Sequence, residues 1–321
     1  MEKRFARYLV SATLVFLLAA GLAALPAADD PPQFSDWSAP VNLGPIVNSN
    51  YAEAGTFISR DGLTLYFGST RSGGVGAAGT FDIWASHRAR VGEPWGPPVN
   101  LGSPVNTIYN EQTPTLTLDG HRLYFARDGL GGYGSQDLYV SRRQRAWDDF
   151  GWRTPVNLGP GINTTAEESG PAVFEDDATG ILTLYFSSTR ATGLGFEDIY
   201  VSTAHPDEAF GTAVLELALS GPFRDVRPFV RRDGLEMYFD SNRPGSLGGV
   251  QVDLWTSSRS SIRETWSEPV RLPDYLNSTA VDARPVVSFD GTELYFHSNR
   301  PGGFGANDLY VSTRTKLKEP D

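Results

Sequence analysis

The chain has 321 residues, a formal net charge of −11, 40% hydrophobic residues, 34 glycines, 22 prolines and no cysteine. The hydrophobic content excludes wholesale disorder, and the missing thiols exclude disulfides, cysteine–zinc sites and thiol nucleophiles. The acidic balance argues against nucleic acid and anionic lipid as partners, because such a surface repels phosphate groups.

The first 28 residues have the layout of a secretory signal peptide. A basic start ending at Arg7 precedes an apolar run from about Leu9 to Leu25, and the small residues Ala27 and Ala28 follow. We therefore expect export to the periplasm or the cell exterior, with an uncleaved N-terminal anchor as the alternative. Cleavage would leave a net charge of −13 and no further segment long and apolar enough to span a bilayer. The absence of disulfides fits a bacterial envelope.

The remaining chain consists of five copies of one repeat of about 57 residues. A Trp-x-x-Pro-Val segment starts at Trp37 and returns at Trp95, Trp152 and Trp266, with a degenerate copy at Phe210. A Leu-Tyr-Phe triplet, first seen at residues 65–67, and an Asp-Ile-Trp block, first seen at residues 82–84, also recur in every copy. Five copies fill the chain from residue 37 onward.

Each copy predicts four short strands. The first runs to an Asp-Gly turn, which is a strong hairpin signal, and the second carries the Leu-Tyr-Phe triplet. A glycine-rich loop leads to the third strand, and the Trp-x-x-Pro-Val segment forms the fourth. The repeat region begins with a fourth strand at 37–44 and ends with a third strand at 308–313.

This order predicts an all-β, five-bladed β-propeller of four-stranded blades. The N-terminal strand would pair into the last blade, which closes the ring and removes exposed strand edges. The propeller is expected to span residues 37–315, between a short linker at 29–36 and a tail at 316–321, and to be monomeric.

The last copy carries a specific signature, Ser-Asn-Arg-Pro-Gly-Gly-Phe-Gly-x-x-Asp-Leu-Tyr-Val-Ser, at residues 298–312. Together with the preceding Asp-Gly turn and Leu-Tyr-Phe triplet, it resembles the WD40-like β-propeller repeat of TolB-type periplasmic proteins. The resemblance covers all five copies and implies binding or scaffolding in the cell envelope. The TolB propeller is six-bladed and follows a separate α/β domain, so the resemblance does not extend to the role of TolB.

Three charged positions recur and are expected on the face of the disc where the first strands begin. Carboxylates at the entry to the first strands are Glu53, Glu111, Glu168, Asp225 and Asp282. Arginines after the second strands are Arg71, Arg127, Arg190, Arg243 and Arg300. Aspartates opening the third strands are Asp82, Asp137, Asp198, Asp253 and Asp308. The entry carboxylates could form a ligand-binding ring at the channel mouth that holds a structural calcium or acts on a glycan. The alternative is an internal arginine–carboxylate ion pair in every blade, built from these repeated groups.

Departures from the repeat are further ligand-binding candidates. Just before the proline of the first strand, the last two copies carry Arg227 and Arg284, where the others have Gly55, Thr113 and Gly170. Two arginines on adjacent blades could clamp a uronic acid or a peptide carboxylate. Alternatively, each pairs with a nearby loop carboxylate.

The sequence therefore predicts a non-catalytic binding or scaffolding propeller that recognises an envelope protein or a glycan without a cofactor. The alternative is a glycan-active enzyme, a hydrolase or a lyase, that uses carboxylates at the central channel; no catalytic residue is assigned. The recurrent tryptophans are expected to pack in the core or between blades. Trp147 lies in an insertion outside the pattern and is expected to be exposed.

Overall fold

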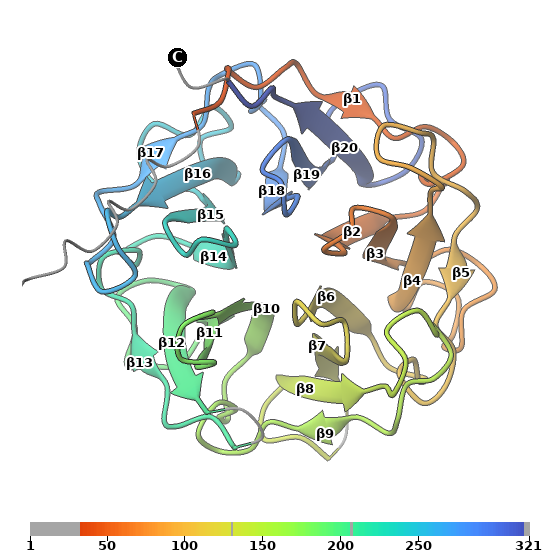
Figure 1. Ribbon diagram of the computed structural model, residues 1–321, viewed down its shortest axis with the longest axis horizontal. Coiled ribbons are helices and arrows are strands. Elements are labelled where there is room, and N and C mark those ends of the chain that lie inside the picture. Colours follow the sequence, from red (N-terminus) through yellow and green to blue (C-terminus); the bar gives the residue numbers. More distant parts are fainter. Residues whose placement is uncertain (1–32, 130, 206–207, 318–321) are drawn as a thin grey trace, which may run out of the picture. The chain divides into compact units, whose positions relative to one another are not determined.

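The computed structural model describes residues 33–129, 131–205 and 208–317. These residues form five four-stranded antiparallel sheets, arranged as blades around a central axis (Figure 1). The predicted five-bladed all-β propeller is confirmed, whereas the signal peptide predicted at residues 1–28 lies outside the described residues. The described part of the chain contains no helix that is long and apolar enough to cross a membrane.

We number the blades 1 to 5 by their innermost strands, which line the axis. These strands are β2 (Glu53–Ile58), β6 (Glu111–Leu116), β10 (Glu168–Glu175), β14 (Asp225–Val230) and β18 (Asp282–Val287). The second strands are β3 (Thr64–Ser69), β7 (Arg122–Asp128), β11 (Leu182–Ser188), β15 (Glu236–Ser241) and β19 (Glu293–Ser298).

The outer half of each blade is less regular. The third strands are β4 (Asp82–His87), β8 (Gln136–Arg142), β12 (Asp198–Ala204), β16 (Asp253–Ser258) and β20 (Asp308–Thr313). The outermost strands are two residues long: β1 (Val41–Asn42), β5 (Val99–Asn100), β9 (Val156–Asn157), β13 (Val214–Leu215) and β17 (Val270–Arg271). The proline before each of β1, β5, β9 and β17 fits this outer edge, because a missing N–H breaks no ladder bond there.

The N-terminal strand closes the ring, as the order of the repeats predicts. β1 pairs with β20 of blade 5, with Val41 opposite Val311. The pairing continues beyond the strands, because Phe34 forms an isolated bridge with Lys316. The chain segment expected to be a linker therefore contributes to blade 5 from residue 33 onward.

Each sheet is buried on both faces, because neighbouring blades pack against it. In blade 1 the triplet of β3 is almost fully buried, and the equivalent side chains behave alike in the other blades. A tryptophan of one blade packs on a tyrosine of the preceding blade, as in the edge-on contact of Trp95 with Tyr295 at 6.3 Å. An arginine stacks on the same indole, with Arg88 4.4 Å from the Trp95 ring. The expected packing role of the recurrent tryptophans is confirmed at this seam.

Each innermost strand contains a break in register next to a residue with positive φ. These residues are Gly55, Thr113, Gly170, Arg227 and Arg284, with φ between 53° and 64°. The Cβ that a substitution would add at Gly55 would lie 3.0 Å from the backbone nitrogen of Thr113 on the next blade. The five residues therefore form a tight ring around the axis, where a side chain adopts this conformation only at a cost.

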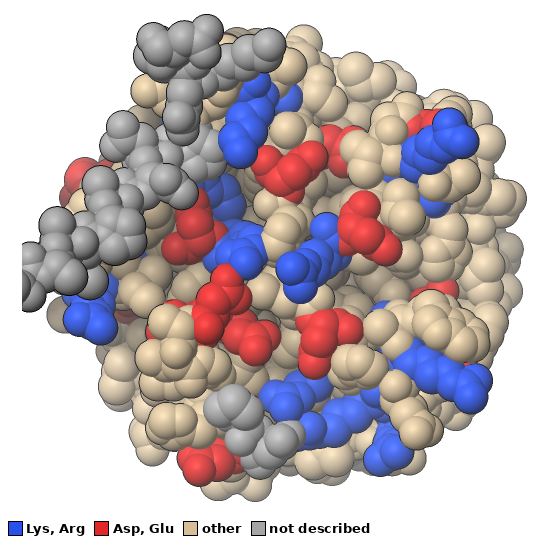
Figure 2. All heavy atoms as spheres, in the orientation of Figure 1, with Lys and Arg blue, Asp and Glu red and all other residues tan. Residues whose placement is uncertain are grey.

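The disc has two faces, which we name by their connections. The entry face carries the loops that lead into the innermost strands and the glycine-rich loops between second and third strands. The turn face carries the turns between first and second strands and the loops between third and fourth strands; Figures 1 and 2 view this face.

Candidate active site

The five entry carboxylates lie on the entry face, and each forms an ion pair within its own blade. All five side chains are fully buried. The pairs are Glu53–Arg71 (3.0 Å), Glu111–Arg127 (2.8 Å), Glu168–Arg190 (3.1 Å), Asp225–Arg243 (2.6 Å) and Asp282–Arg300 (2.5 Å). The contacts thus match the internal ion pair of each blade. A ligand could reach these carboxylates only if a pair opened, so a binding role for them stays a prediction.

The aspartates that open the third strands anchor the glycine-rich loops. Asp82, Asp137, Asp198, Asp253 and Asp308 accept backbone N–H groups of Val75, Tyr133, Leu194, Leu247 and Phe304, respectively. The expectation that these aspartates pair with the repeated arginines needs correction. Each of these carboxylates lies at the base of a glycine-rich loop and accepts hydrogen bonds from backbone N–H groups of that loop. Asp253 additionally lies 3.4 Å from Arg271 of its fourth strand. Within the described ranges no cluster of three or more His, Asp or Glu side chains could hold a metal ion.

Arg227 and Arg284 lie on adjacent innermost strands, but their guanidinium groups point to different places. Arg227 is partly exposed and pairs with buried Asp240 at 2.6 Å, a strand carboxylate and not a loop carboxylate. Arg284 is 2% exposed and donates to the carbonyl oxygen of Thr113 at 3.1 Å. Because Thr113 belongs to blade 2, the Arg284 side chain of blade 5 crosses the axis. An anion clamp formed by the two arginines would require Arg284 to leave this position.

Burial of Arg284 has electrostatic consequences for its neighbours. Desolvation, aided by the charge of Arg227, lowers the pKa of Arg284 to about 9. Burial also raises the pKa of Asp240, against the attraction of Arg227. His297, next to this group, has a pKa well below its usual value because it is buried and the charges of both arginines add to the effect.

The buried neutral His297 predicts that stability falls in acid. In the unfolded chain the histidine binds a proton below pH about 6.5, whereas in the folded chain it stays neutral. Stability is therefore fully present above that pH and is lost as the pH falls. His297→Gln, which keeps an acceptor, should reduce the loss between pH 7 and pH 5 by about 2 kcal/mol. Urea unfolding at pH 7 and pH 5 measures this loss of unfolding free energy, with His205→Gln at an exposed position as the control. Equal losses of unfolding free energy in the two variants would contradict the prediction.

A second group of charged residues on the entry face occupies positions at which every blade has a different residue. The residue before each entry carboxylate is Glu167 in blade 3 and Arg224 in blade 4, but Ala52, Asn110 and Val281 in the others. Before the third-strand aspartate, blade 3 carries Glu197. A parallel backbone bridge across the boundary between blades 3 and 4 brings Glu197 and Arg224 together. Bridges between equivalent positions occur at other blade boundaries.

The two glutamates have different electrostatic surroundings. Glu197 accepts two hydrogen bonds from Arg224, at 2.6 Å from Nε and 2.7 Å from Nη2, in a planar arginine–carboxylate pair. Desolvation, followed by the negative charge of Glu197, raises the pKa of Glu167. An arginine-bound carboxylate beside a carboxyl group with a raised pKa is an arrangement that acid–base catalysis can use.

An aromatic side chain lies directly beside this pair. Phe196 precedes Glu197 and is 74% exposed, and its N–H donates to the carbonyl of Phe223 at 3.2 Å. Tyr133, which is 48% exposed, lies on the glycine-rich loop of blade 2 that packs against residues 164–166 just before Glu167. Exposed rings beside carboxyl groups suit a saccharide, which offers apolar C–H faces and hydroxyl groups.

The sequence interpretation did not single out Glu167, Glu197, Arg224 or Phe196. They occupy three columns of the repeat in which every blade has a different residue, so the repeat pattern did not mark them. These columns, which precede the entry carboxylate and the third-strand aspartate, had to be compared across blades. The parallel bridge between those columns, which brings blades 3 and 4 together here, is a tertiary feature.

The comparisons with known proteins come from structure, because the sequence matches no family model and no curated protein. An α-L-arabinofuranosidase from Podospora anserina, solved with cellotriose, has a TM-score of 0.57 and 12% identity over 88% of this chain and 98% of its own. An α-L-arabinofuranosidase from Lactobacillus brevis has a TM-score of 0.58 and 14% identity over 87% and 94%. That of Fusarium graminearum, solved with arabinobiose, has a TM-score of 0.52 and 10% identity over 88% and 98%. At these identities the likeness shows that the chain shares the fold of five-bladed glycoside hydrolase propellers.

Proposed function

We propose that the protein is an exported glycan-active enzyme, a glycoside hydrolase whose catalytic carboxyl groups are Glu167 and Glu197. The observation that carries the proposal is this pair of neighbouring carboxyl groups on the entry face, one bound by Arg224 and the other with a raised pKa. The fold shared with arabinofuranosidases supports the same chemistry. The signal-like residues 1–28 support a location outside the cytoplasm.

The proposed reaction divides the proton transfers between the two glutamates. Protonated Glu167 gives its proton to the glycosidic oxygen, so that the bond from the anomeric carbon to this oxygen breaks and the leaving sugar departs as an alcohol. The Glu197 carboxylate takes a proton from the water that forms the new bond to the anomeric carbon. Arg224 orients Glu197, and Phe196 packs on the sugar ring.

A non-catalytic glycan-binding propeller is the second candidate. It is favoured by the five internal ion pairs, which leave the entry carboxylates engaged in blade structure. In this case Phe196, Tyr133 and the two glutamates would bind a saccharide without cleaving it. The TolB-type, WD40-like repeat that the sequence resembles agrees with binding in the envelope and is kept as a proposal for the repeat type.

The test is incubation of residues 29–321 with arabino-, xylo- and galacto-oligosaccharides, followed by chromatography of the products. Release of shorter saccharides by the wild type, but not by Glu167→Gln/Glu197→Gln, would establish the hydrolase. Saturable binding of a saccharide without release would favour the binding propeller. Neither release nor binding by any of these oligosaccharides would overturn both.

A further inference from the structure

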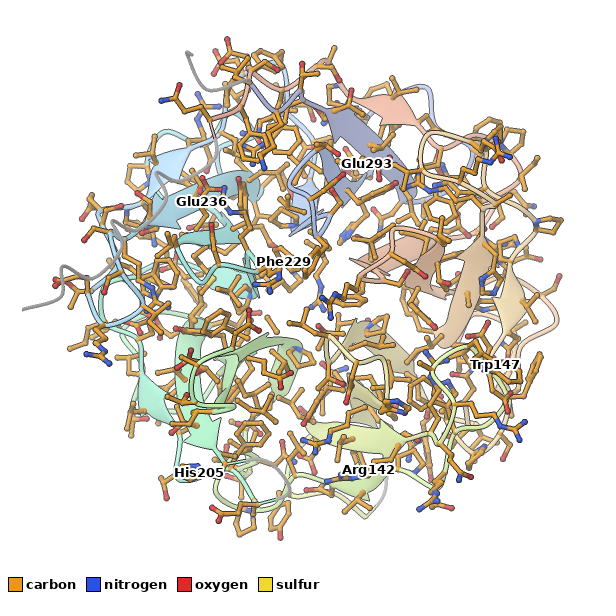
Figure 3. All side chains as sticks on the ribbon, viewed as in Figure 1. Arg142, Trp147, His205, Phe229, Glu236 and Glu293 are labelled. Carbon is orange, nitrogen blue, oxygen red and sulfur yellow. The ribbon has the colours of Figure 1, made fainter. Side chains whose placement is uncertain are left out.

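The turn face carries a cleft of about 550 Å³ that the proposed reaction does not use. It lies between blades 1 and 2, and its walls come from the β2–β3 turn, the β6–β7 turn and the loop from β8 to β9. Figure 3 shows Trp147 of that loop lying on the side of β4 and β5, away from its own strand β8. The cleft is therefore covered on one side by a loop that leans from blade 2 toward blade 1.

The loop that forms this wall is held in place by Asp149. The carboxylate accepts hydrogen bonds from Arg143 (3.2 Å) and from the Tyr66 hydroxyl (3.1 Å) and pairs with His87 Nε2 at 2.7 Å. The second nitrogen of His87 lies 3.1 Å from the Thr64 hydroxyl. Because Tyr66, His87 and Thr64 belong to blade 1, these bonds fix the position of the blade 2 loop before any ligand arrives.

The side chains facing the cleft combine aromatic surface with balanced charge. Trp147 is 75% exposed, as its place outside the repeat predicts, and Phe57 and Phe289 form the inner wall. Arg60 stacks on Phe289 at 4.9 Å, while Asp61 and Asp119 cap the adjacent turns. Figure 2 shows basic side chains at the centre of this face with acidic ones around them, so the face has no single sign of charge.

This combination selects a class of ligand. The apolar face of a sugar can stack on a large exposed indole beside polar groups at little cost in free energy. Guanidinium and carboxylate groups together provide donors and acceptors for hydroxyl groups. An acidic sugar would meet Asp61 and Asp119 as well as Arg60, so charge gives it no advantage. These features together match a neutral saccharide.

We propose that the turn-face cleft is a second, non-catalytic site that binds a neutral oligosaccharide, with Trp147 as the stacking platform and Arg60 and Thr64 as hydrogen-bonding groups. The site is independent of the entry-face glutamates and does not rest on their proposed catalysis. Asp149 is a positioning residue, because its carboxylate holds the loop that carries Trp147.

The experiment measures binding of cellohexaose and xylohexaose by calorimetry and by tryptophan fluorescence. It uses the Glu167→Gln background, so that any turnover on the entry face cannot consume the ligand. We expect saturable binding with a fluorescence change, and an affinity about ten-fold lower or worse in Trp147→Ala. Phe150→Ala is the matched control, because Phe150 lies in the same loop, is 67% exposed and does not line the cleft.

Three results would count against the proposal. Absence of binding by both neutral hexasaccharides would overturn it, as would equal affinity in Trp147→Ala and Phe150→Ala. Tighter binding of an oligogalacturonate than of the neutral sugars would overturn the ligand class. If the hexasaccharides bind through Trp147 while Glu167→Gln leaves turnover unchanged, the cleft stands and the proposed hydrolase site fails.

Discussion

Glu167→Gln is expected to lower kcat on a cleaved saccharide by about 10²- to 10⁴-fold, with the fold intact, because the amide cannot supply the proton that the leaving oxygen needs. The side chain is exposed, so the substitution removes no core packing. The measurement is the initial rate of product release by the wild type and the variant at several pH values. In the wild type the raised pKa of Glu167 should place the alkaline limit of activity above that of an ordinary glutamate.

Two controls show whether the loss reflects proton donation. An aryl glycoside with an acidic phenol as leaving group needs little protonation, so Glu167→Gln should cleave it much better than a natural saccharide. Glu268→Gln, at an exposed position far from the pair in sequence, should retain full activity. An equal loss of rate on both substrates would assign Glu167 to binding, and an unchanged rate would remove it from the site.

Removal of residues 1–45 is expected to destabilise blade 5, which is formed mainly by the other end of the chain. The deletion takes away β1, and with it the ladder to β20 and the hydrogen bond from Asn42 to Asp308 at 2.7 Å. It also removes Trp37, whose ring lies 4.2 Å from Arg314. The cost should exceed that of one large-to-small core substitution, about 3–5 kcal/mol, because a strand and an indole leave together.

The matched control for this deletion begins at residue 33 and keeps every described residue. Thermal unfolding should give this control the midpoint of a chain starting at residue 29. The chain starting at residue 46 should unfold many degrees lower and self-associate in size-exclusion chromatography, because the outer edge of β20 becomes free to pair. Equal midpoints for the two deletions would show that ring closure by β1 contributes little to stability.

The architecture could be predicted from the sequence because each part of the repeat has a local cause. Asp-Gly turns and the Leu-Tyr-Phe triplet specify the inner hairpin, and the chain order of third and fourth strands specifies ring closure. The entry carboxylates and arginines were also recognisable as a set. Their buried pairing follows from their fixed positions in every blade, and it was one of two alternatives that the pattern allowed.

The candidate sites were harder to predict, because they depend on contacts across blade boundaries. Arg284 looked like a surface cation beside Arg227, but its side chain crosses the axis toward blade 2, whereas Arg227, with a similar positive φ, pairs with Asp240. Glu197 and Arg224 are 27 residues apart and meet only through a bridge between blades. Asp149 meets His87 because one loop leans over its neighbour. Repeat columns indicate which residues depart from the pattern, but not which departures meet.

The arginine that crosses the axis lies between the two faces of the disc. An innermost strand of six residues spans roughly 20 Å at about 3.3 Å per residue, so the two faces are separated by about that height. A short sugar bound on one face is therefore separated from the other face by the height of the disc. A polymer could engage both only by passing around the rim, where the fixed spacing would raise the effective concentration of its second contact. The protein would then distinguish saccharides by chain length, because a long polymer would bind at both faces and a short fragment at only one.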